Sequence, residues 1–448
     1  MPQRRSKKKK QGQNLALTRN ITNKSDLDLA EYIADDALQC YPVNQPSKPL
    51  QIEAVVRLAR LRNTFVMAGT GFGKSCISEM YVHLFATSKK PVVLVLNPLN
   101  ALGDNQVQEK IQQGYTAVNL KKLTFNAKVA NQILQGSYTF VYLSPEVSLN
   151  NELFTEIYYN TKFQERLVLT VVDKAHMIYS WGLVASGKAK ISKAHKRHQD
   201  RALFRPSYGD LGTQLMATED SPILLLSATC RPLAIAEILK CLSIEESNIN
   251  FVRGELTRPE IRILRFPMNC SLKSANNLVA MFASKEQFDD DLLVPTLIYS
   301  GTRNATLEVM KVVNEARATP TGENNPKSHL ICHYHACTGD ADKEDTISGY
   351  EDGSFPMISC TMALGLGQNW KRVRRVIHMG RGDPSSICQM IGRCGRDGKP
   401  GLAILFMEKK RKSGINQLGG LTGPKVDKEV DDTRMDALAL TPVRIYSN

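Results

Sequence analysis

Short runs of consecutive apolar residues recur along the chain, and longer stretches with the amphipathic spacing of helices separate them. The first half of the chain contains five such runs, at residues 64–68, 92–97, 138–144, 167–173 and 223–229. Strands that are apolar over their whole length are typical of parallel sheets covered by helices on both faces. The pattern therefore predicts one α/β domain that contains all five strands.

A second series of apolar runs follows at residues 294–300, 329–335, 356–361, 373–380 and 402–407, again separated by helix-like segments. Two doubly wound α/β domains joined near residues 256–272 explain this repetition. We predict a basic disordered arm (1–24), a first α/β domain (25–255), a C-terminal α/β domain (256–410) and a mobile tail without a core of its own (411–448).

The charge of the chain narrows the class of partner. The 448 residues carry a formal net charge of +14, an excess that favours a polyanion such as nucleic acid. No apolar run approaches the roughly 20 residues of a membrane-spanning helix, and the basic N-terminal segment lacks the apolar core of a secretory signal. We therefore expect a soluble protein of the nucleus, with the cytoplasm as the other compartment, and no membrane partner.

The ten cysteines are scattered singly and include no C-x-x-C pair, a pattern typical of reduced core cysteines. The segment CHYHAC, residues 332–337, is the one cluster that resembles a zinc site. Side chains alternate between the faces of a strand, so Cys332, His333 and His335 would not converge on one metal ion. We expect no zinc.

The segment AGTGFGKS, residues 68–75, lies between a predicted strand and a helical stretch. Small residues allow backbone N–H groups to surround a phosphate, while the lysine reaches the outer phosphates and the serine hydroxyl binds Mg²⁺. Asp173, at the end of a later apolar run, is the expected second contact of the magnesium ion. We predict ATP at Gly69, Thr70, Gly71, Phe72, Gly73, Lys74 and Ser75, and Mg²⁺ at Ser75 and Asp173.

A second polar segment, QMIGRCGRDG, lies near the end of the second series of runs. On a helix, Arg393 and Arg396 would share one face and reach the γ-phosphate of a nucleotide held by the other domain. We predict that Gln389, Arg393 and Arg396 act in catalysis together with Lys74 and Asp173.

The order of these motifs resembles the two-domain motor core of superfamily 2 helicases, and specifically the RecQ family of DNA helicases. The resemblance runs from residue 48 to residue 401 and includes KPLQIEAV, TLIYSGTR and LLSATC, which contains Ser227 and Thr229. It implies two tandem RecA-like P-loop domains with parallel sheets flanked by helices, ATP with Mg²⁺, and Gln51 as the residue that reads adenine. Lys48 and Asn44 replace an arginine and an aromatic residue of the family pattern, so we expect looser base selectivity.

The segment FRPSYGDLG, residues 204–212, and Trp181 resemble the aromatic-rich loop that couples single-stranded DNA to the ATP site in RecQ proteins. Aromatic rings and arginine planes stack on bases without reading their sequence. We expect Trp181, Phe204, Arg205 and Tyr208 to bind single-stranded or tailed DNA. The basic insertion at 183–203 is either a solvated loop or an added phosphate contact. No cysteine follows Cys394, so the zinc-binding subdomain usual after the RecQ motor is not expected.

Lys174 is the most consequential departure, because the family has there a glutamate that orients or deprotonates the attacking water. A cationic lysine does not accept this proton near neutral pH unless burial lowers its pKa strongly, and Asp173 and a triphosphate act in the opposite direction. Loss of a general base typically costs ~10²–10⁴-fold in rate. Unless Gln389 and an ordered water compensate, hydrolysis is slow. Two functions remain open: a 3′-to-5′ DNA helicase in repair or recombination, and a hydrolysis-impaired protein that binds ATP and DNA as a clamp or scaffold. The sequence does not identify protein partners.

Overall fold

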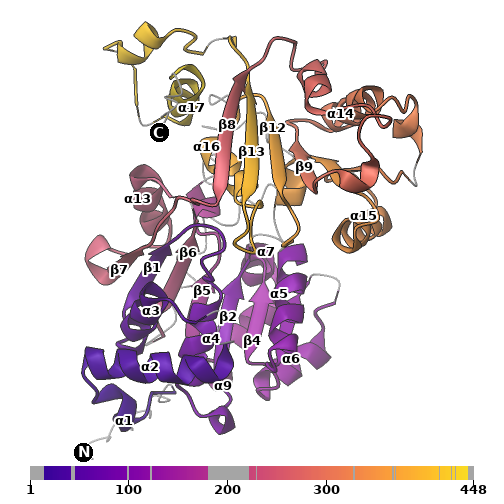
Figure 1. Ribbon diagram of the computed structural model, residues 1–448. Helices are drawn as coiled ribbons and strands as arrows, with labels where there is room; N and C mark the ends of the chain where they lie inside the picture. The colour runs from indigo at the N-terminus through magenta and orange to yellow at the C-terminus, as the bar shows by residue number, and fades with distance from the viewer. Residues whose placement is uncertain are drawn as a thin grey trace, which may run out of the picture.

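The computed structural model describes residues 15–41, 46–97, 100–121, 124–179, 221–228, 230–325, 328–365, 368, 370–412, 414–424, 426–428 and 430–441. Within these residues two parallel sheets form the framework, one in each half of the chain (Figure 1). The strand orders are β3-β4-β2-β5-β6-β1-β7 and β10-β11-β9-β12-β13-β8. The predicted fold class, two α/β domains with parallel sheets flanked by helices, is confirmed. We call the parts that carry these sheets the first and the second domain.

All five apolar runs of the first half form strands of one sheet, as predicted. Its strands are β1 (Asn63–Met67), β2 (Val92–Leu96), β3 (Ala117–Leu120), β4 (Phe140–Leu143), β5 (Leu167–Val172), β6 (Ile223–Ser227) and β7 (Ile249–Arg253). The additional strands, β3 and β7, lie at the two edges of the sheet and are only partly buried. An edge strand needs fewer apolar residues, which explains why the search for continuous apolar runs missed both.

Helices cover both faces of the first sheet. They are α1 (Arg19–Thr22), α2 (Asp26–Cys40), α3 (Pro49–Ala59), α4 (Cys76–His83), α5 (Asn100–Gln112), α6 (Ala127–Leu134), α7 (Pro145–Asn150), α8 (Glu152–Tyr158), α9 (Thr161–Gln164) and α13 (Pro232–Cys241). One apolar core joins the sheet to α2, α3 and α4, and the other joins it to α6, α8 and α13. Ile21 of α1 is buried in the first of these cores. The predicted disordered arm, residues 1–24, is therefore wrong for residues 19–22, and residues 1–14 lie outside the described residues.

The second sheet confirms the other five predicted strands. Its strands are β8 (Ile261–Pro267), β9 (Thr296–Tyr299), β10 (Ile331–Tyr334), β11 (Met357–Cys360), β12 (Arg375–Met379) and β13 (Gly401–Met407), with helices α14 (Arg303–Ala316), α15 (Asp340–Asp352) and α16 (Pro384–Ile391). Strand β8 falls inside the segment predicted as the joint between the domains. It pairs with β13 at the edge of the sheet, and most of its residues are exposed or half-buried.

The C-terminal part contradicts the predicted mobile tail. Helix α17 (Asp431–Leu440) packs on the second domain, where Met435 is fully buried in the apolar core. The Arg381 guanidinium is buried and pairs with the Asp436 carboxylate at 2.8 Å. Asp431 pairs with Arg231 of the first domain at 2.8 Å. The acidic residues of this segment suggest exposure to solvent, which is why a mobile tail was predicted. In the structure these residues pair with arginines from elsewhere in the chain.

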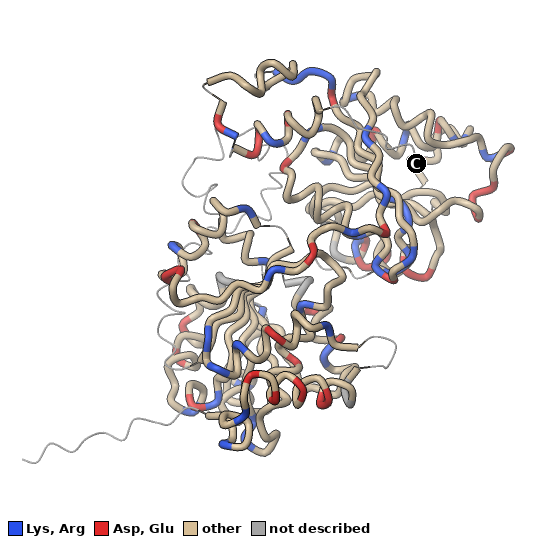
Figure 2. The backbone as a smooth tube through the Cα atoms, turned by 60° about the vertical axis from the view of Figure 1, so that its left-hand side comes forward, with Lys and Arg blue, Asp and Glu red and all other residues tan. Residues whose placement is uncertain are grey.

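None of the described helices is long and apolar enough to cross a membrane. Figure 2 shows basic and acidic residues interspersed along both domains. Two of the densest groups of lysine and arginine in the sequence, in the first ten residues and at 183–203, lie outside the described residues.

Candidate nucleotide site

The segment from Ala68 to Ser75 forms the turn between β1 and α4, in the strand-to-helix setting predicted for a phosphate-binding loop. Gly71 and Gly73 have φ values of 81° and 82°, in the left-handed region that favours glycine. A Cβ atom on Gly73 would lie 2.7 Å from the Nε2 atom of Gln51. The loop therefore requires glycine for its backbone conformation and also for its close packing against α3.

Lys74 is folded back onto the loop. Its ammonium donates hydrogen bonds to the carbonyl oxygens of Ala68, at 2.7 Å, and Gly69, at 2.8 Å. Burial lowers the pKa of Lys74 to about 7; Asp173 opposes this shift, while Lys174, Arg396 and Lys48 add to it. A buried lysine among other cations is stabilised in its charged form by an anion, which is what a triphosphate would supply.

Gln51 holds the loop from the side of α3. Its Nε2 atom donates to the carbonyl oxygens of Phe72 (3.0 Å) and Gly73 (2.9 Å), and its Oε1 atom accepts from the backbone N–H of Lys48 at 2.7 Å. The Lys48 ammonium lies 4.9 Å from the centre of the Phe72 ring. In this structure Gln51 positions the phosphate-binding loop, and the contact with adenine stays a prediction.

Three neighbouring strands of the first sheet end at this site, because β5, β6 and β1 are adjacent in the strand order. Asp173 follows β5, Ser227 ends β6, and the loop follows β1. The Oδ1 atom of Asp173 accepts the backbone N–H of Lys174 at 2.8 Å, and its Oδ2 atom accepts from Gln106 of α5 at 3.4 Å. The predicted second magnesium contact thus lies at the same sheet edge as the loop.

Lys174 adopts a left-handed backbone conformation with φ 54°, and its ammonium lies 3.5 Å from the Oδ2 atom of Asp173. Burial lowers the pKa of Lys174, and the adjacent carboxylate opposes this shift. A bound triphosphate would act in the same direction as Asp173 and favour the charged ammonium. With a triphosphate bound, Lys174 would therefore be a cation next to the carboxylate, at the position where the RecQ pattern has a second acid.

His176, which the sequence analysis did not select, links the two domains. Its Nδ1 atom lies 2.9 Å from the Ser227 hydroxyl, and its Nε2 atom lies 2.8 Å from the Nε2 atom of Gln389 in α16. Burial lowers the pKa of His176 to about 4, so the imidazole is neutral at pH 7. The Gln389 amide nitrogen can only donate, so His176 Nε2 accepts and Nδ1–H donates to Ser227. The amide of Gln389 is thus engaged in holding the domains together.

Arg393 and Arg396 converge on one carbonyl oxygen, but they do not share the face of a helix as predicted. Helix α16 ends at Ile391, and Arg393 and Arg396 lie in the turns that follow, so the prediction that they share a helix face is wrong. The helix stops at Gly392, where a Cβ atom would lie 2.2 Å from the Thr70 hydroxyl of the phosphate-binding loop. Both guanidinium groups donate to the carbonyl oxygen of Gln368. Burial lowers the pKa of Arg393 and lowers that of Arg396 to about 9.

Arg258 joins the phosphate-binding loop to the second domain. Its guanidinium donates to the carbonyl and hydroxyl oxygens of Thr70, both at 3.0 Å, and to the carbonyl oxygens of Cys394 (3.2 Å) and Gly395 (2.9 Å). The Thr70 hydroxyl also donates to the Gly392 carbonyl at 3.1 Å. Arg258 was not predicted from the sequence. It lies in the joint between the domains, outside the spaced motifs that identify residues of the nucleotide site.

The donor set fits a nucleotide triphosphate. The loop carries backbone N–H groups, Lys74 and the arginine pair supply positive charge, and the buried Nε atom of Arg393 has no hydrogen-bond partner among the described residues. The Ser75 hydroxyl and the Asp173 carboxylate are oxygen donors of the kind that Mg²⁺ prefers. They fit a magnesium ion less well than the loop fits the phosphates, because the Lys174 ammonium already neutralises the carboxylate.

The predicted DNA-binding residues, Trp181, Phe204, Arg205 and Tyr208, lie outside the described residues, as do Thr229 and Asn44. Within the part of the chain that the structure describes, no group of three or more His, Cys, Asp or Glu side chains is arranged to hold a metal ion.

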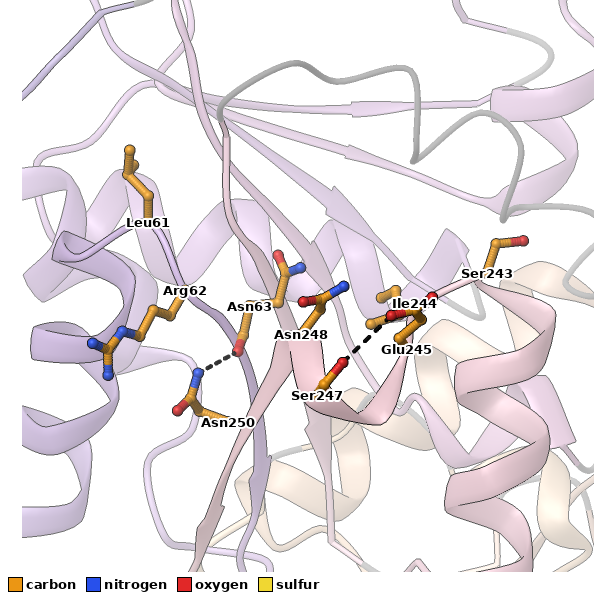
Figure 3. A pocket seen from close by; sticks show the side chains of 9 residues that line it. All are labelled: Leu61, Arg62, Asn63, Ser243, Ile244, Glu245, Ser247, Asn248 and Asn250. Carbon is orange, nitrogen blue, oxygen red and sulfur yellow. Dashed lines mark hydrogen bonds between the residues drawn. The ribbon is translucent and has the colours of Figure 1, made fainter.

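A polar pocket of about 650 Å³ lies elsewhere in the first domain (Figure 3). It is lined by residues that include Asn63, at the start of β1, and Asn250, near the start of β7. The Asn250 amide donates to the Asn63 carbonyl at 3.5 Å. The phosphate-binding loop follows the opposite end of β1, so this pocket is separate from the nucleotide site.

Comparisons with known proteins identify helicases as relatives of this chain. A family model described as DEAD/DEAH box helicase matches residues 48–238, and one described as Helicase conserved C-terminal domain matches residues 292–398. The chain is 27% identical over 353 residues to the ATP-dependent DNA helicase RecQ of Haemophilus influenzae, covering 78% of this chain and 49% of the relative. It is 26% identical over 349 residues to a probable ATP-dependent DNA helicase, RecS, of Bacillus subtilis, covering 77% and 61%.

The fold is also similar to the crystal structure of the DUF1998 helicase MrfA bound to DNA and AMPPNP. The TM-score is 0.59 at 16% sequence identity, over 90% of this chain and 52% of the other. The chain thus spans about half the length of RecQ from Haemophilus influenzae and of MrfA.

Proposed function

We propose that this chain, which belongs to the RecQ family of superfamily 2 helicases, is an ATP-dependent DNA helicase. In this proposal it moves 3′ to 5′ on single-stranded DNA. The observation that carries the proposal is the contact of the phosphate-binding loop with the arginine-bearing turns of the other domain. Thr70 touches Gly392 at the start of those turns, and Arg396 is close enough to lower the pKa of Lys74. A phosphate bound at the loop would therefore be sensed by both domains.

Each residue of the site has a role in this proposal. The loop and Lys74 bind the triphosphate, Ser75 and Asp173 would hold Mg²⁺, and Arg393 and Arg396 stabilise negative charge on the γ-phosphate. When bound, Mg²⁺ would neutralise phosphate charge. Gln51 sets the shape of the loop through its two hydrogen bonds to loop carbonyl oxygens. The hydrogen bond between His176 and Gln389 holds the two domains in their relative positions while the nucleotide is bound.

DNA is the proposed polymer substrate. The net charge of +14 supports a polyanionic partner, and the aromatic segment at 204–212 supports stacking on unpaired bases. We propose a preference for single-stranded or tailed duplex DNA, with binding that weakens steeply as salt rises, and a role in repair or recombination. The basic segment at residues 4–10 supports a nuclear location, which a fluorescent fusion with and without that segment tests.

A second candidate function follows from Lys174. Its ammonium is 3.5 Å from Asp173, at the position where a carboxylate would orient the attacking water. The amide nitrogen of Gln389 is engaged with His176, and its amide oxygen can accept a hydrogen bond from water but is too weak a base to take a proton as a carboxylate would. These observations favour slow hydrolysis, and in the limit a clamp that binds ATP and DNA without separating strands.

Strand displacement on tailed duplexes separates the two functions. Duplexes with a 3′ or a 5′ single-stranded tail are incubated with the protein and ATP, and release of the labelled strand is measured. We expect release from the 3′-tailed duplex only. ATP and DNA binding without release from either duplex would support the clamp, and release from the 5′-tailed duplex alone would contradict the proposed direction.

The coupling of DNA to the ATP site has its own test. The double variant Trp181→Ala, Phe204→Ala should lose most of the stimulation of ATP hydrolysis by single-stranded DNA while it still binds DNA, because stacking and phosphate contacts are separate contributions. Equal stimulation in parent and variant would show that these aromatic residues do not couple the sites.

A further inference from the structure

The turn after β5 places a positive charge beside the carboxylate that would serve the metal ion. The Lys174 backbone N–H donates to Asp173 Oδ1 at 2.8 Å, and the Lys174 ammonium lies 3.5 Å from Asp173 Oδ2. The side chains of Lys174 and Asp173 are only 23% and 13% exposed. Screening by solvent is weak at such a site, so the charge of the ammonium acts strongly on its neighbours.

The surroundings of Lys174 are cationic apart from Asp173. Arg393 and Arg396 act on it electrostatically from the second domain, and Lys174 in turn acts on Lys74 of the phosphate-binding loop. The carboxylate of Asp173 is the one acid among the main electrostatic influences on both lysines in the described part of the chain. With a triphosphate bound, which favours the charged form of both lysines, this site would therefore hold more cations than acids even without a metal ion.

An excess of positive charge at the site reduces the need for Mg²⁺ in the binding of ATP. Mg²⁺ helps a protein bind ATP because it offsets the repulsion between the phosphates and nearby carboxylates. Two adjacent acids, as in the family pattern, make that contribution essential. Here one acid is replaced by an ammonium, which is a compact cation with three donors and a common ligand of phosphate.

We infer that the Lys174 ammonium takes over the charge-neutralising role of the divalent cation, so that this site binds ATP with little dependence on Mg²⁺. The inference rests on the proposed nucleotide site and goes beyond it, because it states which component of that site is dispensable. It also separates two consequences of one residue: loss of the water-orienting acid affects hydrolysis, whereas the added charge affects binding.

The test is an equilibrium titration of a fluorescent ATP analogue in Mg²⁺ and in EDTA at equal ionic strength. For the parent protein we expect the two dissociation constants to agree within about threefold. For Lys174→Glu we expect binding in EDTA at least about tenfold weaker than in Mg²⁺, a difference of roughly 1.4 kcal/mol. Lys174→Met removes the charge without adding an acid and should lie between the two.

Lys128→Glu is the matched control, because it makes the same change of charge on an exposed residue of α6, far along the chain from the site. It should behave as the parent does. Thermal melting of every variant checks that it is folded, and Lys174→Met keeps the test decisive if the glutamate variant does not fold.

The outcomes separate this inference from the proposed function. Parent protein that binds the analogue only in Mg²⁺ would overturn the role of Lys174 and leave the nucleotide site intact. Equal ratios of the two constants in the parent and in Lys174→Met would also overturn it. Absence of binding in both buffers would instead refute the nucleotide site.

Discussion

The phosphate-binding loop and the turn after β5 lie at the same edge of one sheet, yet they relate to their family in opposite ways. Residues 68–75 keep every feature that the chemistry of phosphate binding requires: glycines at positive φ, a half-buried lysine, and a strand and helix on either side. The turn at 173–175 keeps its aspartate and replaces the neighbouring acid with a lysine. In the proposed function, nucleotide binding and water activation would therefore depend on different segments, so that one could change while the other is kept.

The two segments also contact the second domain differently. Arg258 and Gly392 reach the phosphate-binding loop through Thr70, whereas Gln389 reaches the end of the turn through His176. In the proposed function, a bound nucleotide would act directly on the contact through Thr70. Domain closure would then follow nucleotide binding even where hydrolysis is slow, which is the property that a clamp requires.

Removal of the loop lysine should have the largest effect. Lys74→Ala deletes the buried cation nearest the loop carbonyl oxygens and should abolish nucleotide binding at concentrations that saturate the parent. Titration with a fluorescent analogue measures this, and Lys89→Ala, on an exposed segment of the same domain, serves as the control. Unchanged affinity in Lys74→Ala would refute the assignment of the loop.

Loss of the bridge between loop and second domain should have the next largest effect. Arg258→Ala removes four hydrogen bonds that link Thr70 to Cys394 and Gly395, and hydrogen bonds to charged groups contribute about 1.5–3 kcal/mol each. The nucleotide-free protein should open, with a larger radius of gyration in solution X-ray scattering. Arg262→Ala, an exposed neighbour on β8, should not change the radius; equal radii for parent and Arg258→Ala would exclude the bridge.

The smallest expected effect is that of pH on the contact with the turn. Burial lowers the pKa of His176 to about 4, below its usual value of 6.5. The charges of Lys174 and Lys74 add to this shift, and those of Asp173 and Asp383 oppose it. Between these two values the unfolded chain binds the extra proton, so stability should fall as pH falls, by roughly 1.4 kcal/mol per pH unit from this residue. Chemical denaturation at pH values between about 7 and 5 measures the slope. His176→Asn should show a shallower slope, and an unchanged slope would remove His176 as its origin.

The sequence predicted most of this fold because its signals are local. Ten apolar runs became ten strands, since a strand buried on both faces must be apolar throughout. The phosphate-binding loop was equally readable, because its glycines and lysine act within eight consecutive residues. Where local structure depends on neighbours in the chain, the pattern of residues was sufficient.

The features that the sequence did not reveal depend on contacts between distant segments. Helix α17 is held by arginines that lie far from it in the chain. Arg258 and Thr70, which are hydrogen-bonded at the nucleotide site, are 188 residues apart in the sequence. The arginine pair lies in turns that follow Gly392, which packs closely against Thr70 of the other domain, and helical periodicity does not describe such a contact. His176 could have been found as part of DKAH, where it follows Lys174 by two residues, but its role required the position of Gln389.

Single-turnover phosphate release measures whether Lys174 limits hydrolysis while nucleotide binding is kept. A preformed complex of protein, ATP and single-stranded DNA is mixed with excess unlabelled nucleotide, and the first turnover is timed for the parent and for Lys174→Glu. We predict release at least about tenfold faster in Lys174→Glu, as expected for a restored general base. A parent rate that equals or exceeds the rate of the glutamate variant would contradict a limiting role of Lys174, because another group would then have to position the water.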